Sequence, residues 1–139
     1  MPLMKGMQVM SVFVAVSDQE QAKEFYVATL GFEVLVDNSW REGMRWIEVA
    51  PEYSASSLTL VSWADSLVPN SRQVIVVATD DIRAIHDKLV AKSVSFDLPP
   101  TETLGGTQAM FRDPDDNALV LWERSSFASR GLTSWLGVS

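Results

Sequence analysis

The alternation of hydrophobic and polar positions divides the first half of the chain into strands and one helix. Residues 10–16 (MSVFVAV) are rich in β-branched and aromatic side chains, which is typical of a strand. Asp18, followed three positions later by Gln21, has the form of a capping box at a helix start. Gly31 is a residue that commonly ends a helix. Three further strands are predicted at residues 32–36, 44–49 and 57–63.

The same order of elements begins again in the second half. A strand is predicted at residues 73–78, and Asp80 then occupies the capping position that Asp18 has in the first half. With these two residues aligned, Ser93 takes the place of Gly31. The remaining strands are predicted at residues 94–98, 107–111 and 118–122. The pattern therefore predicts two copies of a β-α-β-β-β unit.

These two copies define the expected organisation of the whole chain. We predict a single α+β domain over residues 1–139, with repeats at about 8–63 and 72–123 and a tail at 125–139 that docks on the protein. A single β-α-β-β-β unit leaves one face of its sheet bare, so two curved mixed sheets are expected to form a shared cup with the helices outside.

The motifs that carry this pattern resemble a known superfamily. They are Val14-Ala15-Val16-Ser17-Asp18, Phe25-Tyr26, Leu30-Gly31-Phe32, Thr79-Asp80-Asp81-Ile82 and Phe111-Arg112-Asp113-Pro114-Asp115-Asp116-Asn117. In order and spacing they are similar to the vicinal oxygen chelate superfamily, which includes glyoxalase I, extradiol dioxygenases, fosfomycin-resistance transferases and bleomycin-resistance proteins. Asp116 stands where the family turn has Gly, and Asp tolerates the left-handed conformation. The resemblance implies a homodimer.

The same resemblance implies where a metal ion would bind. The four ligand positions of the metal-dependent members fall on Ser11, Thr59, Val74 and Val120. These side chains lack the imidazole and carboxylate groups that hold a transition metal. The only histidine, His86, is expected on the polar side of its helix, away from the cup. We therefore expect the metal-free branch, with no cofactor.

Strand alternation predicts which side chains line the cup. Residues two positions apart in a strand share a face, so the neighbours of the four ligand positions should also face inward. The expected ligand-binding residues are Ser11, Phe13, Trp46, Glu48, Thr59, Val61, Trp63, Val74, Met110, Val120 and Trp122, with Val76 and Gln108 beside them. An apolar, tryptophan-lined cup of this kind suits a small aromatic or apolar molecule, and a cationic one would gain from the tryptophan faces and Glu48.

Composition narrows the functions further. The chain carries 18 Asp and Glu against 11 Lys and Arg, a formal charge of −7, so nucleic acid is not an expected partner. It has no cysteine and no long apolar segment, which favours a cytoplasmic protein and gives no reason to expect a membrane partner.

Two other functions remain open at this point. The first is an atypical lyase, isomerase or dioxygenase-like enzyme that uses Glu48 as its acid or base. The second is a partner-binding domain whose tryptophans, Trp46 and Trp63 included, fill a core or an interface. Two structural roles are also predicted: Arg112 pairs with Asp113 or Asp115 to hold its turn, and Gly105-Gly106 forms a turn.

Overall fold

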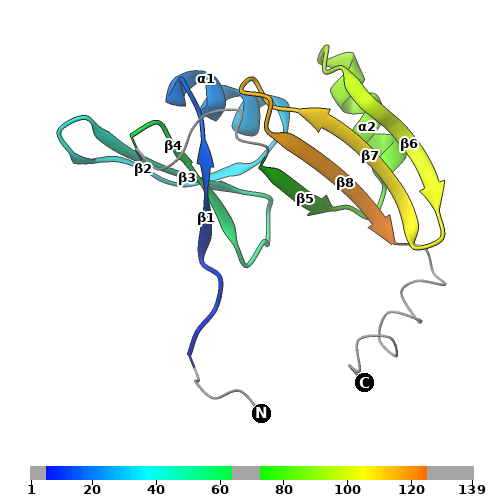
Figure 1. Ribbon diagram of the computed structural model, residues 1–139, viewed down its shortest axis with the longest axis horizontal. Helices are drawn as coiled ribbons and strands as arrows, with labels where there is room; N and C mark the ends of the chain where they lie inside the picture. Colours follow the sequence, from blue (N-terminus) through cyan, green and yellow to red (C-terminus); the bar gives the residue numbers. More distant parts are fainter. Residues whose placement is uncertain (1–5, 64–72, 125–139) are drawn as a thin grey trace. The chain divides into compact units, whose positions relative to one another are not determined.

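The computed structural model describes residues 6–63 and 73–124, and the chain divides into two compact units, Met1–Ser71 and Arg72–Ser139. Each unit contains one of the two predicted repeats (Figure 1). The predicted tail at 125–139 and the side chain of Trp40 lie outside the described residues. Within the described part of the chain, no helix is both long enough and apolar enough to cross a membrane.

The first unit is the predicted β-α-β-β-β repeat. Its elements are β1 (Ser11–Ala15), α1 (Gln19–Glu24), a π-helical turn η1 (Phe25–Thr29), β2 (Glu33–Arg41), β3 (Met44–Ala50) and β4 (Ser57–Val61). The strands form one mixed sheet in the order β1-β4-β3-β2, with β1 parallel to β4 and the other pairs antiparallel.

The second unit repeats this topology. Its elements are β5 (Val74–Ala78), α2 (Ile82–Ala91), β6 (Phe96–Thr103), β7 (Gly106–Arg112) and β8 (Ala118–Arg124). The sheet order is β5-β8-β7-β6, again with one parallel pair, β5 and β8. The two-repeat α+β fold predicted from the sequence is therefore confirmed, whereas the shared cup stays a prediction.

The residue that caps the helix is the predicted one in the first repeat and is one residue later than predicted in the second. The carboxylate of Asp18 accepts a hydrogen bond from the backbone N–H of Gln21 at 3.1 Å. In the second repeat Asp81, not Asp80, caps the helix, by accepting from the N–H of Ala84 at 3.1 Å. The prediction of Asp80 was wrong because α2 starts at Ile82, and a capping side chain reaches the N–H three positions after it.

Three positions outside the regular elements adopt the left-handed backbone that the motifs require. Gly31 ends the first helix with φ 80°, and Ser93 takes the equivalent role after α2 with φ 69°. Asp116 has φ 64°, so the turn keeps its shape without the glycine of the family motif. The turn predicted at Gly105-Gly106 lies one residue earlier, at Leu104-Gly105, because Gly106 already pairs with Thr103 as the first residue of β7.

Both Asp113 and Arg112 hold the turn after β7, but they do not pair with each other. The buried Asp113 carboxylate accepts backbone hydrogen bonds from Asp115 and Asn117, both at 2.9 Å. Arg112 lies on the exposed face, where its guanidinium donates to Asp97 at 2.8 Å and to the carbonyl of Asp116 at 2.9 Å. The predicted pairing of Arg112 with Asp113 or Asp115 was therefore wrong, because the Asp113 carboxylate accepts from backbone N–H groups of the turn and Arg112 pairs with Asp97 of β6 instead.

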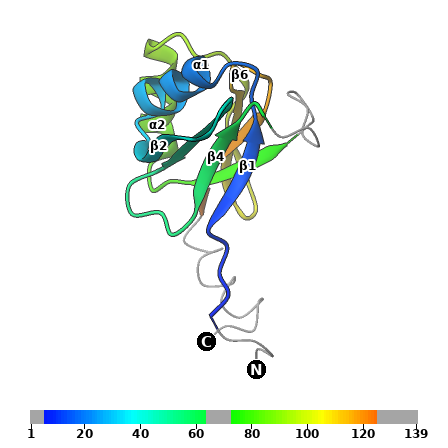
Figure 2. The ribbon, with the colours of Figure 1, turned by 90° about the vertical axis from the view of Figure 1, so that its left-hand side faces the viewer.

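In each unit, the helix packs on one face of the sheet. Helix α1 contacts β3 and β4, and α2 contacts β6, β7 and β8 (Figures 1 and 2). The strand residues on these helix-covered faces are buried: Val14, Ile47, Val49, Leu60, Ala109, Phe111, Leu119 and Leu121. The alternation of strand side chains therefore leaves the opposite face of each sheet for the candidate site.

Candidate functional site

Three aromatic rings form a cluster on the open face of the first sheet. Phe13 of β1 lies edge-on to Trp46 of β3, with ring centroids 5.6 Å apart, and edge-on to Trp63, 5.8 Å away. Trp46 and Trp63 lie 6.0 Å apart and are tilted by 31°. All three side chains are half-buried, so each keeps part of its surface available. The prediction that these residues share a face agrees with this arrangement.

Hydrogen bonds to one carbonyl fix the position of this cluster. The indole N–H of Trp63 donates to the backbone oxygen of Arg45 at 2.8 Å. The side-chain amide of Gln19, at the start of α1, donates to the same oxygen at 2.7 Å and to the carbonyl of Leu60 at 2.8 Å. The start of α1 is therefore tied to β3, which carries Trp46, and to β4, which ends just before Trp63.

The helix-covered side of β3 carries a network of ion pairs. Asp37 accepts hydrogen bonds from Arg45 at 2.8 Å and from Lys23 of α1 at 2.7 Å, and Arg45 also contacts Glu20 at 2.6 Å. The hydrogen bonds from Arg45, and then that from Lys23, hold the pKa of Asp37 well below its usual range. Hydrogen bonds to Asp37 and then Glu20 raise the pKa of Arg45. This network orients β3 against α1.

A carboxylate lies beside the aromatic cluster. Glu48 stands opposite Thr59 of β4, which in turn stands opposite Phe13 of β1. Its Oε1 accepts a hydrogen bond from the indole N–H of Trp46 at 2.7 Å, and its Oε2 accepts one from the hydroxyl of Ser57 at 2.9 Å. The carboxylate is thus held in place by two neutral donors.

Ser57 was not among the site residues predicted from the sequence. It begins β4, and it lies two positions before Thr59 and therefore on the same face. Extending the alternation back to the first residue of the strand would have found it.

In this chain, the side chains at the four positions where metal-dependent members of the superfamily bind their ion are not suited to holding a metal. Ser11 and Thr59 are paired with each other through their hydroxyl oxygens, 2.5 Å apart. In the second unit, Val74 and Val120 offer only hydrocarbon. Among the residues the structure describes, no group of three or more His, Asp or Glu side chains is arranged to hold a metal ion.

The second sheet presents an apolar open face. Val76, Val120 and Met110 stand opposite one another on β5, β8 and β7, and Trp122 stands between Ala78 and Gln108. Val74 and Val76 are 62% and 64% exposed. The residues predicted to face the cup from the second repeat therefore share one face of this sheet.

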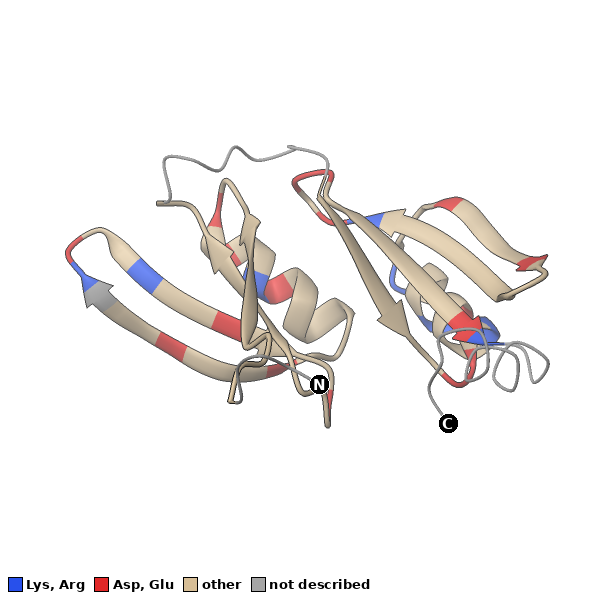
Figure 3. Ribbon diagram, turned by 60° about the horizontal axis from the view of Figure 1, so that its bottom comes forward, with Lys and Arg blue, Asp and Glu red and all other residues tan. Residues whose placement is uncertain are grey.

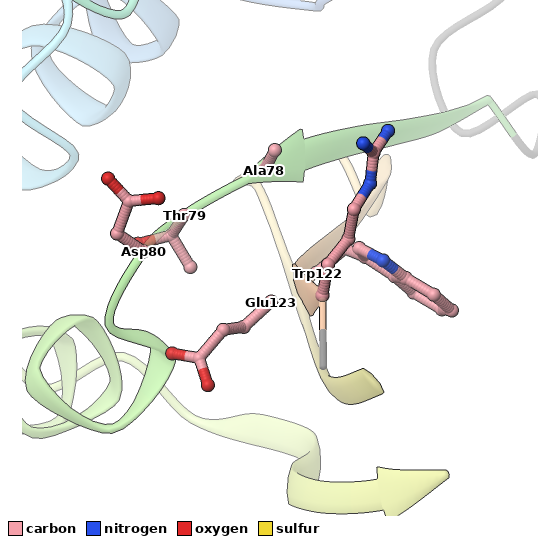
Figure 4. Close-up of a pocket in the computed structure, with 6 residues that line it drawn as sticks. Ala78, Thr79, Asp80, Trp122 and Glu123 are labelled. Carbon is pink, nitrogen blue, oxygen red and sulfur yellow. The ribbon is translucent and has the colours of Figure 1, made fainter. Parts of the chain in front are cut away.

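A pocket of about 540 Å³ lies where the parallel strands β5 and β8 end. Its lining residues are Ala78, Thr79, Asp80, Trp122, Glu123 and Arg124 (Figure 4). Glu123 accepts a hydrogen bond from the N–H of Ile82 at 2.9 Å, so its carboxylate caps the start of α2. Of these residues only Trp122 was predicted from the sequence as a ligand-binding residue, because the pocket depends on how the ends of two strands distant in sequence pair.

His86 lies on α2 and does not belong to the open face of either sheet. Its ring lies 4.5 Å from that of Phe96, and its Nδ1 lies 3.3 Å from Asp87. Its side chain is 24% exposed, so the expectation of a solvated histidine was only partly correct.

The fold and these motifs place the chain in a family. The chain belongs to the glyoxalase/bleomycin resistance protein/dioxygenase superfamily, whose family model matches residues 8–121. TnmS3, an antibiotic binding protein from Streptomyces sp. CB03234, is similar in structure with a TM-score of 0.82; the two are 41% identical, over 88% of this chain and 99% of that one.

Two further similar proteins come from other bacteria. A superfamily member from Sphaerobacter thermophilus DSM 20745 has a TM-score of 0.76 and 32% identity, over 87% of this chain and 100% of its own. The uncharacterized protein YetH of Bacillus subtilis (strain 168) is 31% identical over 119 residues, which cover 84% of this chain and 98% of that protein.

Proposed function

We propose that this protein is a cytoplasmic homodimer that binds a small aromatic or apolar organic molecule, of the kind found among antibiotics, without a metal ion. The observation that carries the proposal is the cluster of Phe13, Trp46 and Trp63 on the open face of the first sheet. The likeness to an antibiotic binding protein supports the choice of ligand class.

The chemistry of the two faces favours a planar ligand. A ring that stacks on the tryptophans and covers about 100 Å² of apolar surface gains about 2–3 kcal/mol from burial. Val74, Met110, Val120 and Trp122 offer a second apolar surface on the other sheet. On the first sheet, Ser11 completes the proposed set, and the buried side chains of Thr59 and Val61 lie beneath this surface and support it.

The donor set supports binding without a metal. The hydroxyls of Ser11 and Thr59 are hydrogen-bonded to each other, and neutral hydroxyls are weak ligands for transition metals. Ligand affinity should therefore be unchanged after treatment with a chelator.

Calorimetric titration of chelator-treated protein with a panel of aromatic antibiotics tests the proposal. We expect at least one to bind and to be recovered unchanged by mass spectrometry. Trp46→Ala should weaken that binding at least about tenfold, because it removes a stacking surface. Tyr53→Ala is the matched control, since Tyr53 is an aromatic residue that is 95% exposed and should not matter. A requirement for added metal, or equal affinity in both variants, would overturn the proposal.

Glu48 favours a second candidate function, an enzyme of the same superfamily. Its carboxylate is fixed between Trp46 and Ser57 beside the aromatic surface, which suits a group that moves a proton. In that case mass spectrometry would show a converted ligand, and Glu48→Gln would abolish the conversion while preserving binding.

A further inference from the structure

The hydrogen bonds that hold the Glu48 carboxylate come from neutral groups rather than from a cation. Among residues 6–63 and 73–124, no Lys or Arg lies within ion-pair distance of its carboxylate, and its donors are the neutral groups of Trp46 and Ser57. Asp37, on the opposite face of the same sheet, instead contacts both Lys23 and Arg45. Two neutral hydrogen bonds position the Glu48 carboxylate and leave acceptor capacity on both oxygens.

The surroundings of Glu48 also favour positive charge. The faces of tryptophan and phenylalanine rings carry negative electrostatic potential, and a cation is attracted to them within about 6 Å. Trp46 belongs both to the aromatic cluster and to the Glu48 hydrogen bonds. The chain as a whole carries −7, and acidic positions occur in both repeats (Figure 3).

From these observations we infer that the ligand is an organic cation, an aromatic or apolar body bearing a protonated or quaternary amine, with Glu48 as its counter-ion. This inference rests on the proposed binding function and specifies the ligand class. A bare metal cation fits poorly, because the described part of the chain holds no group of three or more His, Asp or Glu side chains that could bind one, and the nearby hydroxyls of Ser11 and Thr59 bond to each other.

Three probes that share one ring system separate charge from shape. They are 1-naphthylmethylammonium, 1-naphthalenemethanol and 1-naphthoate, which are positive, neutral and negative. We expect calorimetric titration of the whole protein to give affinities in that order, with the cation at least about tenfold tighter than the alcohol. The advantage of the cation should shrink as salt is added.

A pair of variants then assigns the effect to one carboxylate. Glu48→Gln keeps the side-chain shape and an oxygen that accepts a hydrogen bond but removes the charge, so it should weaken the cation about tenfold and leave the alcohol unchanged. Glu24→Gln makes the same change in net charge at an exposed position of α1 and should affect neither probe.

The outcomes distinguish this inference from the function on which it rests. Equal affinity for the cation and the alcohol, or a Glu48→Gln variant that still prefers the cation, overturns the inference and leaves aromatic binding standing. Binding of none of the three probes overturns both.

Discussion

Among the glycines that the structure describes, Gly106 has the least room for a side chain. Its φ is 150°, and a Cβ atom built there would lie 2.2 Å from the carbonyl oxygen of Glu123 on β8. That contact is with backbone, so β7 and β8 would have to separate. Gly43 also has a positive φ, 75°, but nothing lies within 4 Å of its Cβ position.

The comparison of these two glycines predicts different losses of stability. Gly106→Ala should lower the free energy of unfolding by about 2–4 kcal/mol, because backbone strain and overpacking add. Gly43→Ala should cost only the strain, about 1 kcal/mol. Urea titration followed by circular dichroism measures both, and equal losses would show that the close approach to Glu123 does not matter.

At the scale of elements, the network around Asp37 fastens α1 to β2 and β3. Hydrogen bonds from Arg45 and Lys23 depress the pKa of Asp37, so the folded state holds its proton less tightly than the unfolded state. The stability that results is fully present above pH 4, the usual range for an aspartate, and is lost as the pH falls below it.

Asp37→Asn should therefore destabilise the protein by about 2 kcal/mol at neutral pH. The difference in free energy of unfolding between the native chain and the variant, called the gap below, should shrink as the pH is lowered from about 4, because the native carboxylate becomes protonated. Urea unfolding across this pH range measures the gap. Asp80→Asn, at an exposed position with no ion pair among the described residues, should show no such trend. A gap that does not change with pH would contradict the role of the Asp37 charge.

The strands also show which parts of the candidate site could be predicted from the sequence. Period-two alternation placed Phe13, Trp46 and Glu48 on one face correctly, because it depends only on the geometry of each strand. The partner of Arg112 was not predictable in this way, because Asp97 lies on β6 and the pairing of β6 with β7 shifts register. The pocket beside Trp122 was missed for a similar reason, since it forms where β5 and β8 end together.

At the scale of the whole molecule, the open face of the second sheet exposes apolar side chains to solvent. Val76 is 64% exposed and shares its face with Val120 and Met110. Removing such surface from water favours association by about 25 cal/mol for each Å² covered. This is the physical support for the proposed homodimer.

Light scattering should therefore give about twice the chain mass of 15.4 kDa. The melting temperature should rise with protein concentration, because association stabilises only the folded state. Val76→Asp should lower the mass at dilute concentrations by placing a charge on the open face. Val90→Asp adds the same charge at a 49% exposed position of α2, on the helix-covered side of the second sheet, and should leave the mass unchanged. A mass of one chain at every concentration, with a constant melting temperature, would refute the dimer and require the apolar faces to be covered by ligand alone.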